Sequence, residues 1–248
     1  MDKLVGYEEK LLVFVDILGW TDAIKNKSFD ELHTVISKIQ ERCYSYSEFH
    51  EDYLKKNMSI KSINPMFFQT KFTMFSDSFA MSTPSNFEAS ICNSTSQIIR
   101  EFLQSGYLLR GGMVKENLYH NSQTIFGAAI INAHAIESKI AKFSRVLIDR
   151  NIIDMLINSD STSIIKDQLG DYVIDPFPIS ATGLTPKILN KMYGLDCIVE
   201  MLEYNVKNII NLDALQKWEY MVKLSKISLA KFGKDTEKWV DHLTSISH

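Results

Sequence analysis

Hydrophobic and polar positions follow two different periods along the chain, which predicts both strands and helices. An almost unbroken apolar run of Leu, Val and Phe occupies residues 10–17, and a run without polar alternation is typical of a strand that is covered on both faces. Gly19 ends this run. A helix is predicted from about Ser28, a candidate N-cap, because apolar residues then recur at helical spacing.

The rest of the pattern predicts further strands and helices. A turn is predicted at Asn64-Pro65, and extended segments over 66–75 and 79–81 flank a hairpin tip at Ser76-Asp77-Ser78. A helix over 87–104, which Gly106 ends, and a second extended pair over 107–114 and 118–126 follow. The chain then continues with a helix from Gly127 through Ala141, a strand over 145–148, a short helix near 152–157 and an edge strand over 172–178. From Pro186 onward only helix is predicted.

This order of elements, β-α-β-β-α-β, predicts an α+β fold. It is the order of the ferredoxin-like split βαβ arrangement, here followed by a C-terminal helical extension. A length of 248 residues is sufficient for one full hydrophobic core of this kind. We expect a main domain over residues 1–180 and a helical extension over 181–248 that packs on it.

Composition and charge disfavour several classes of protein. Lysine and arginine number 27 and aspartate and glutamate 30, a net charge of −3, whereas proteins that bind nucleic acid by neutralising phosphates are normally basic. Three widely spaced cysteines fit neither a disulfide framework nor a structural zinc site. No apolar run reaches the roughly 18 residues of a membrane span, and the first residues hold no signal-peptide core. We therefore expect a soluble, cytoplasmic protein without nucleic-acid or membrane partners.

Two carboxylates stand where such a sheet would bring them together. Asp16 lies near the end of the first predicted strand and Asp77 at the hairpin tip, and these elements are neighbours in a split βαβ sheet. Carboxylates at close range repel each other unless a cation lies between them, and a hard divalent ion with phosphate oxygens as further ligands suits such a pair. The alternative interpretation is structural: Asp77 stabilises a turn, and Asp16 caps the helix that follows.

Three sequence blocks resemble the class III nucleotide cyclases. Phe14-Val-Asp16-Ile-Leu-Gly19-Trp20 is similar to the opening motif of that family, and Phe75-Ser-Asp77-Ser is similar to the hairpin that carries its second metal-binding aspartate. The third block consists of Arg110-Gly-Gly, Leu118-Tyr-His120, Ile125-Phe-Gly127-Ala, Ala133 and Glu137. The blocks occur in the order of the family and span roughly residues 10–150.

The resemblance implies a two-metal active site in a homodimer. Asp16, Asp77 and the backbone carbonyl of Ile17 would hold two Mn²⁺ or Mg²⁺ ions, one activating the 3′-hydroxyl of a nucleoside triphosphate and the other holding its β- and γ-phosphates. The turn Leu18-Gly19-Trp20-Thr21 would offer backbone N–H groups to the triphosphate. Sites of the family form between two subunits, one providing the metal ligands and the other the base contacts.

A narrower resemblance concerns the substrate and the biological role. Arg145-Val-Leu-Ile, Asp175-Pro-Phe and the helical tail are most similar to the compact pyrimidine cyclases of bacterial antiphage (Pycsar) systems. This similarity implies UTP or CTP as the substrate, cUMP or cCMP as the product, and generation of a second messenger in antiviral defence.

The resemblance also assigns residues to recognition of the base. Lys71, six residues before Asp77, and Thr124, three residues before Gly127, would contact the edges of the base. The alternative is a solvated lysine on an edge strand and a threonine that fills a β position. Phe14 and Phe75 would wall the base pocket, although large aromatic residues in strands are more often part of the core.

The chain departs from the family at two positions of one helix. Purine cyclases of the family carry an Asn and an Arg there that stabilise charge on the transferring phosphate, and the alignment places Ile131 and Ala135 at these positions. Loss of such an arginine can cost several powers of ten in rate. Arg110 is the candidate catalytic replacement, with Lys139 and Arg145 as further candidates; the alternative for Arg110 is an ordinary salt bridge at a strand end.

Two other functions remain open at this point. The departure allows a catalytically degenerate, cyclase-like module that binds a nucleotide or only dimerises. A palm enzyme of the polymerase or diguanylate type is disfavoured, because the hairpin reads Phe-Ser-Asp-Ser rather than Gly-Gly-Asp-Asp or Gly-Gly-Glu-Glu.

Overall fold

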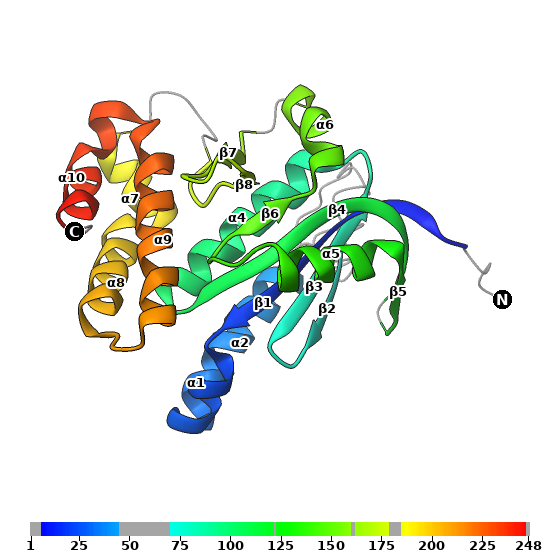
Figure 1. Cartoon of the computed structure of the whole chain (residues 1–248), viewed down its shortest axis with the longest axis horizontal. Coiled ribbons are helices and arrows are strands. Elements are labelled where there is room, and N and C mark those ends of the chain that lie inside the picture. The colour runs from blue at the N-terminus through cyan, green and yellow to red at the C-terminus, as the bar shows by residue number, and fades with distance from the viewer. Residues whose placement is uncertain (1–5, 45–69, 122, 160–161, 179–184, 247–248) are drawn as a thin grey trace, which may run out of the picture.

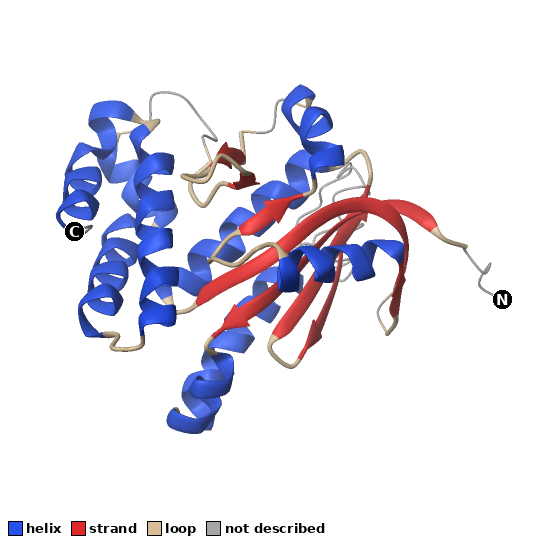
Figure 2. Ribbon diagram, in the orientation of Figure 1, coloured by secondary structure: helices blue, strands red, loops and turns tan. Residues whose placement is uncertain are grey.

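The computed structural model describes residues 6–44, 70–121, 123–159, 162–178 and 185–246. Within them one mixed sheet of eight strands is flanked by helices (Figures 1 and 2). The strands are β1 Glu8–Leu18, β2 Lys71–Phe75, β3 Ser78–Pro84, β4 Leu108–His120, β5 Ile125–Gly127, β6 Val146–Ile148, β7 Ile164–Lys166 and β8 Tyr172–Ile174. The α-helices are α1 Trp20–Asn26, α2 Phe29–Tyr44, α4 Glu88–Gln104, α5 Ala128–Lys139, α6 Ile153–Asn158, α7 Pro186–Tyr193, α8 Leu195–Asn208, α9 Leu212–Ala230 and α10 Glu237–Ile246.

The predicted split βαβ core is confirmed. The strand order is β2-β3-β1-β4-β6-β8-β7, so that β1 lies between β3 and β4 and pairs antiparallel with both. Strands β2 and β3 form the hairpin, and β5 pairs with the far end of β4. This is the α+β, ferredoxin-like arrangement, and from residue 185 on the described chain is helical, as expected of the C-terminal extension.

Helices cover both faces of this sheet. Helix α4 packs on β1, β3 and β4, and the ring of Phe102 in α4 stacks on Phe79 of β3. Helix α5 lies on the opposite face, over β1 and β4 (Figure 1). The backbone of β4 approaches this helix closely: a Cβ atom at Gly112 would lie 2.7 Å from the carbonyl oxygen of Ala133. The glycine therefore permits a packing distance that any side chain would prevent.

One predicted feature of β4 is wrong. The sequence pattern indicated a hairpin between residues 107–114 and 118–126, but β4 runs unbroken through this region and the turn lies four to seven residues later. Gly111 and Gly112 suggested an interruption, whereas Gly111 lies close to the backbone of Phe14 in β1 and Gly112 lies close to α5. The actual turn is closed by Asn121, whose side-chain oxygen accepts from the backbone N–H of Thr124 at 2.7 Å.

Three shorter elements also differ from the predictions. Helix α1 and strand β7 were not predicted; β7 has only three residues, which is too short for a periodic pattern. Strand β8 is not an edge strand, because β7 pairs with it on its outer side. The predicted turn at Asn64-Pro65 and residues 66–69 of the first extended segment lie outside the described residues.

The C-terminal helices share one hydrophobic cluster with the sheet, and α8 packs on α4. Polar contacts reinforce this packing. Buried Arg145, just before β6, donates to Asp167 (2.5 Å) and Asp171 (2.9 Å), and the hydroxyl of Tyr220 in α9 also donates to Asp167. Asp175, directly after β8, accepts from Ser228 and Lys231 of the same region. A search of the described helices finds none that is long and apolar enough to cross a membrane.

Candidate active site

The fold brings Asp16 and Asp77 to the same end of adjacent strands. Asp16 is opposite Ser78 in the β1–β3 ladder, and Asp77 lies in the two-residue turn just before β3. The N–H of Ile17 donates to the carbonyl oxygen of Asp77 at 2.8 Å, which ties the turn to β1. The backbone carbonyl of Ile17 points toward the same turn, because the N–H and C=O groups of a residue in an antiparallel strand point to the same side of that strand.

The structural alternatives for the two aspartates do not match their contacts. Gly19 is the N-cap of α1, in the left-handed conformation with φ 79°, and the helix has no side-chain cap; Asp16 therefore does not cap it. The carboxylate of Asp16 accepts instead from the hydroxyl of Ser78 at 3.2 Å. The carboxylate of Asp77 makes no hydrogen bond or ion pair within the described part of the chain, so it does not stabilise the turn. The turn includes Ser76 at φ 53°, a strained conformation for a residue other than glycine.

The local charges are unbalanced. Burial, followed by the carboxylates of Glu137 and Asp77, raises the pKa of Asp16, while the guanidinium of Arg110 and the hydroxyl of Ser78 oppose this change. The partly buried carboxylate of Asp16 thus has two other carboxylates and one guanidinium as its charged neighbours, a balance that favours uptake of a further cation.

Arg110 lies opposite Asp16 in the β1–β4 ladder. Its Nε donates to Oε1 of Glu137 at 2.6 Å, and Nη2 also pairs with this oxygen, whereas Nη2 is 3.6 Å from Oδ2 of Asp16. Arg110 therefore belongs to the cluster of its own chain. Arg145 is excluded as a replacement, because its guanidinium is 5% exposed and bound to Asp167 and Asp171.

The residues present fit a divalent cation whose coordination a ligand completes. Among the described residues no three His, Cys, Asp or Glu side chains are grouped to hold a metal by themselves. Mg²⁺ sites in proteins commonly use one or two carboxylates together with substrate phosphates and water. Asp16, Asp77 and the carbonyl of Ile17 provide such a partial set of hard oxygen donors, and Asp77 has no competing partner among the described side chains.

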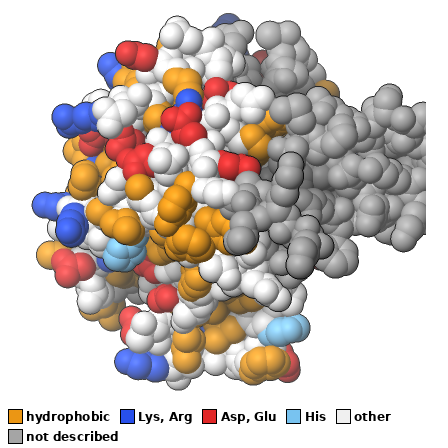
Figure 3. Space-filling model, turned by 90° about the vertical axis from the view of Figure 1, so that its right-hand side faces the viewer, with side chains coloured by type: hydrophobic (Ala, Val, Ile, Leu, Met, Phe, Trp, Pro, Cys, Tyr) orange, Lys and Arg blue, Asp and Glu red, His pale blue; other side chains and the backbone are white. Residues whose placement is uncertain are grey.

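A cleft of about 620 Å³ opens beside Asp77. Its lining is mostly apolar and comes from β1, the hairpin, β5 and α5: Phe14, Phe75, Asp77, Ser78, Ile125, Ile130, Ile131 and His134. Strand β4 curves over the sheet, which carries β5 to the side of the hairpin (Figure 1). Figure 3 shows hydrophobic side chains gathered on this side of the molecule. Phe14, 8% exposed, is thus both part of the core and a wall of the cleft.

The other predicted site residues surround this region without forming one group. Lys71 is half-buried at the start of β2, opposite Ser82, while Thr124 is exposed in the turn before β5. Leu18 ends β1, and Gly19 joins it to α1. The indole ring of Trp20 is 7% exposed and packs on Tyr107, so only the backbone of this residue could serve a ligand.

For His120, which belongs to the third sequence block, the sequence favours a satisfied packing or surface role over a chemical one. The structure gives it a defined one: its ring nitrogens contact the hydroxyls of Thr73 and Ser82, both at 2.8 Å. Burial, together with Lys10 and Lys71, lowers the pKa of His120 to about 4. The neutral ring therefore joins the curved end of β4 to the hairpin. A histidine in the otherwise β-forming run 118–126 was the only sequence signal.

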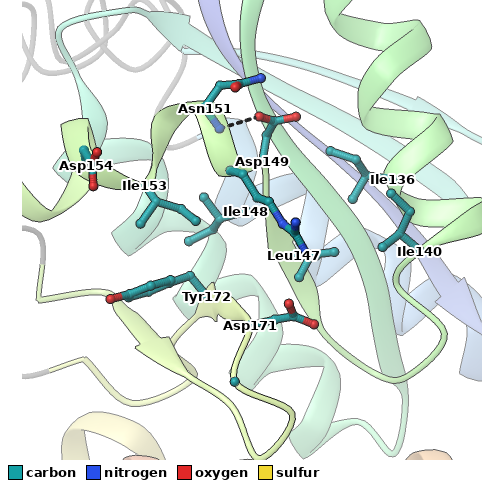
Figure 4. Close-up of a pocket in the computed structure, with 12 residues that line it drawn as sticks. Ile136, Ile140, Leu147, Ile148, Asp149, Asn151, Ile153, Asp154, Asp171 and Tyr172 are labelled. Carbon is teal, nitrogen blue, oxygen red and sulfur yellow. Dashed lines mark hydrogen bonds between the residues drawn. The ribbon is translucent and has the colours of Figure 1, made fainter.

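A second cavity, of about 780 Å³, lies on the other side of α5. Figure 4 shows Ile136 of α5 and Ile140, directly after this helix, facing Asp149, Asp171 and Tyr172 across it. None of the predicted site residues lines this cavity.

Of the known proteins compared with this chain, only solved structures are similar to it. No family model matches the chain, and no curated protein matches it. The catalytic core of a rhodopsin-guanylyl cyclase with converted specificity, in complex with ATPαS, superposes with a TM-score of 0.43 at 13% identity, over 68% of this chain and 96% of that one. A bacterial light-regulated adenylyl cyclase gives 0.42 at 13% identity, over 70% of this chain and 93% of that one. At this identity the similarity concerns the fold.

Proposed function

We propose that this protein is a nucleotide cyclase that converts a nucleoside triphosphate to a 3′,5′-cyclic nucleotide and pyrophosphate. The observation that carries the proposal is the meeting of Asp16 and Asp77 at the ends of adjacent strands, beside Arg110 and next to an apolar cleft. A metal-bound nucleotide requires carboxylates whose charge neighbouring cations do not balance, a guanidinium for its phosphates and an apolar space for its planar base.

In the proposed reaction the 3′-oxygen bonds to the α-phosphorus, the bond from that phosphorus to the β-bridging oxygen breaks, and the hydroxyl proton passes to water. Divalent ions held by Asp16, Asp77 and the Ile17 carbonyl would supply the Lewis acidity that activates the hydroxyl and neutralises the phosphates. Arg110 contributes a planar donor group to phosphoryl oxygens. The backbone of residues 18–21 lies directly after the metal ligands and offers N–H groups to the triphosphate.

The cleft supports binding of the base. Phe14 and Phe75 present aromatic surface, Ile125 faces them, and a volume of about 620 Å³ accommodates a base and its sugar. Lys71 and Thr124 are proposed to read the base edges. We propose UTP or CTP as substrate, with cUMP or cCMP as product, on the sequence resemblance to the pyrimidine cyclases, which also suggests a role in antiviral defence in the cytoplasm.

We propose that the active form is a homodimer with residues 1–180 as its catalytic domain. Large apolar side chains are exposed around the cleft: Phe75 at 42%, Phe126 at 45% and Ile131 at 68%. Such a patch is typical of a surface that a partner covers. A second copy placed there would add its base contacts to the metal ligands of the first.

One observation favours a second candidate, the nucleotide-binding module without turnover. Ile131 is exposed at the cleft and Ala135 is half-buried on the same helix, so neither position supplies a polar group to a transition state. Asn132, one residue away, is held by Glu116 through its amide at 2.8 Å.

Incubation of the purified protein with Mn²⁺ and each of the four nucleoside triphosphates, with products identified by mass, tests the proposal. A cyclic nucleotide and pyrophosphate in equal amounts are expected, in larger yield from UTP or CTP. Nucleotide binding by calorimetry with no product from any triphosphate would establish the module instead.

A further inference from the structure

The guanidinium of Arg110 is anchored on Glu137 rather than on Asp16. Both Nε and Nη2 pair with Oε1 of Glu137, while the distance of 3.6 Å from Nη2 to Asp16 exceeds that of a hydrogen bond. Nη1 has no partner among the side chains that the structure describes. The edge of the guanidinium that carries Nε and Nη2 is therefore fixed on Glu137, and Nη1 is left without such a partner.

Glu137 reaches Arg110 because α5 lies unusually close to β4. Gly112, two residues after Arg110, has no side chain, and a Cβ there would lie 2.7 Å from both Ala133 O and Ile136 Cβ. The carboxyl of Glu137 is consequently only 5% exposed, compared with 24% for Arg110 and 22% for Asp16. A carboxylate buried to this degree needs a permanent partner, and Arg110 is that partner.

We propose that Glu137 is a positioning residue of the active site, which holds Arg110 away from Asp16 and thereby keeps Asp16 available to a divalent cation. The inference rests on the proposed function, since it concerns the same site. Without the charge of Glu137, Arg110 would pair with the nearest remaining carboxylate, that of Asp16, and would compete there with the metal. Glu137 thus acts on the metal through Arg110 and touches neither metal nor nucleotide itself.

The test measures binding of Mn²⁺ to the nucleotide-free protein by electron paramagnetic resonance. Glu137→Gln is expected to weaken binding by about tenfold, since an ion pair with Asp16 replaces the one with Glu137. Arg110→Gln is expected to tighten it, because the competing cation is gone. In the Arg110→Gln background, Glu137→Gln should weaken binding much less than it does in the wild type, since only the direct attraction between its charge and the ion is then lost.

Glu116→Gln is the matched control. Glu116 also joins β4 to α5, through Asn132 at 2.8 and 2.9 Å, but it lies six residues along the strand from Arg110. The substitution removes the same charge between the same two elements, and it should leave Mn²⁺ affinity unchanged. If Glu137→Gln fails to fold, Glu137→Asp, which retains the charge but is shorter, should give a smaller loss of affinity in the same direction.

The outcomes separate this inference from the proposed function. Unchanged Mn²⁺ affinity in Glu137→Gln, or an equal loss with and without Arg110, would overturn the positioning role and leave the cyclase proposal standing. Coupling between Glu137 and Arg110 in a protein that forms no cyclic product would overturn the cyclase proposal alone. A wild-type protein that binds no Mn²⁺ in the absence of nucleotide would overturn this inference, while formation of a cyclic product by the same protein would leave the cyclase proposal standing.

Discussion

Two arginine–carboxylate clusters of this protein differ in how their charges are balanced. Around Arg145, an aspartate with a fully buried carboxylate, a second aspartate and the hydroxyl of Tyr220 surround a guanidinium that is 5% exposed. Around Arg110, the guanidinium lies within ion-pair distance of Glu137 and Asp16, Asp77 adds a third negative charge near Asp16, and Asp16 and Arg110 remain more than a fifth exposed. The first cluster joins the sheet to α9, and the second has capacity for another cation. The balance of charge and the access to solvent distinguish a structural cluster from a reactive one.

The largest expected effect is on activity in the second cluster. Asp16→Ala or Asp77→Ala should reduce product formation by about a thousandfold or more, since each removes a proposed ligand of the metal. The thermal midpoint of the metal-free protein should stay the same or rise, because one of several repelling carboxylates is gone. Product yield and calorimetric midpoint are measured on the same samples. A sharp fall in the midpoint of both variants would indicate structural roles for both aspartates.

The first cluster should show the opposite behaviour. Arg145→Met leaves the buried carboxylate of Asp167 without its main partner, which should cost about 3–5 kcal/mol in the free energy of unfolding. Turnover per folded molecule should not change. Tyr220→Phe, which removes only the hydroxyl contact to Asp167, should cost about 1 kcal/mol. Urea titrations measure the free energy of unfolding of both variants. A loss of turnover without a loss of stability in Arg145→Met would contradict the distinction between the clusters.

The lowered pKa of His120, which belongs to neither cluster, predicts how the free energy of unfolding depends on pH. Its pKa is lowered to about 4 in the folded protein from an ordinary 6.5, so the unfolded chain binds the proton first as the pH falls. His120 therefore does not change the free energy of unfolding above pH 6.5. As the pH falls from 6.5 to about 4, it lowers the free energy of unfolding progressively, by about 3 kcal/mol in total. His120→Gln should remove this component from urea titrations between pH 7 and 4. An unchanged pH profile in the variant would show that the imidazole has the same pKa in the folded and the unfolded chain.

Arg110→Lys probes the geometry of the second cluster. A planar guanidinium can bridge two oxygens, whereas an ammonium is a point charge, so turnover should fall by about tenfold or more while nucleotide affinity changes little. Steady-state kinetics and calorimetry with the same triphosphate separate the two quantities. Turnover at the wild-type rate would remove Arg110 from the catalytic set.

Local patterns predicted the elements that hold the reactive cluster. The unbroken apolar run before Asp16 and the turn at Ser76-Asp77-Ser78 are properties of contiguous residues, and both elements formed where expected. The contacts among side chains depend on residues distant in sequence. Glu137 meets Arg110 across 27 positions, and only the close packing of α5 on Gly112 brings them together.

The same reason explains why the partners of His120 could not be predicted. Thr73 is 47 residues away from it and Ser82 is 38 residues away, and β4 must continue past the predicted turn and curve for the imidazole to reach them. A sequence pattern predicts that a strand forms and which side chains share a face, but not how far a strand bends.

The most direct test of the central claim, that the 3′-oxygen of a bound triphosphate attacks its own α-phosphorus at Asp16 and Asp77, compares UTP with 3′-deoxy-UTP in the presence of Mn²⁺. Wild-type protein should release pyrophosphate and cUMP in equal amounts from UTP and neither from the 3′-deoxy analogue, although both should bind. Asp16→Ala should release neither from UTP. Pyrophosphate released equally from both triphosphates would show that water is the nucleophile and would contradict cyclisation.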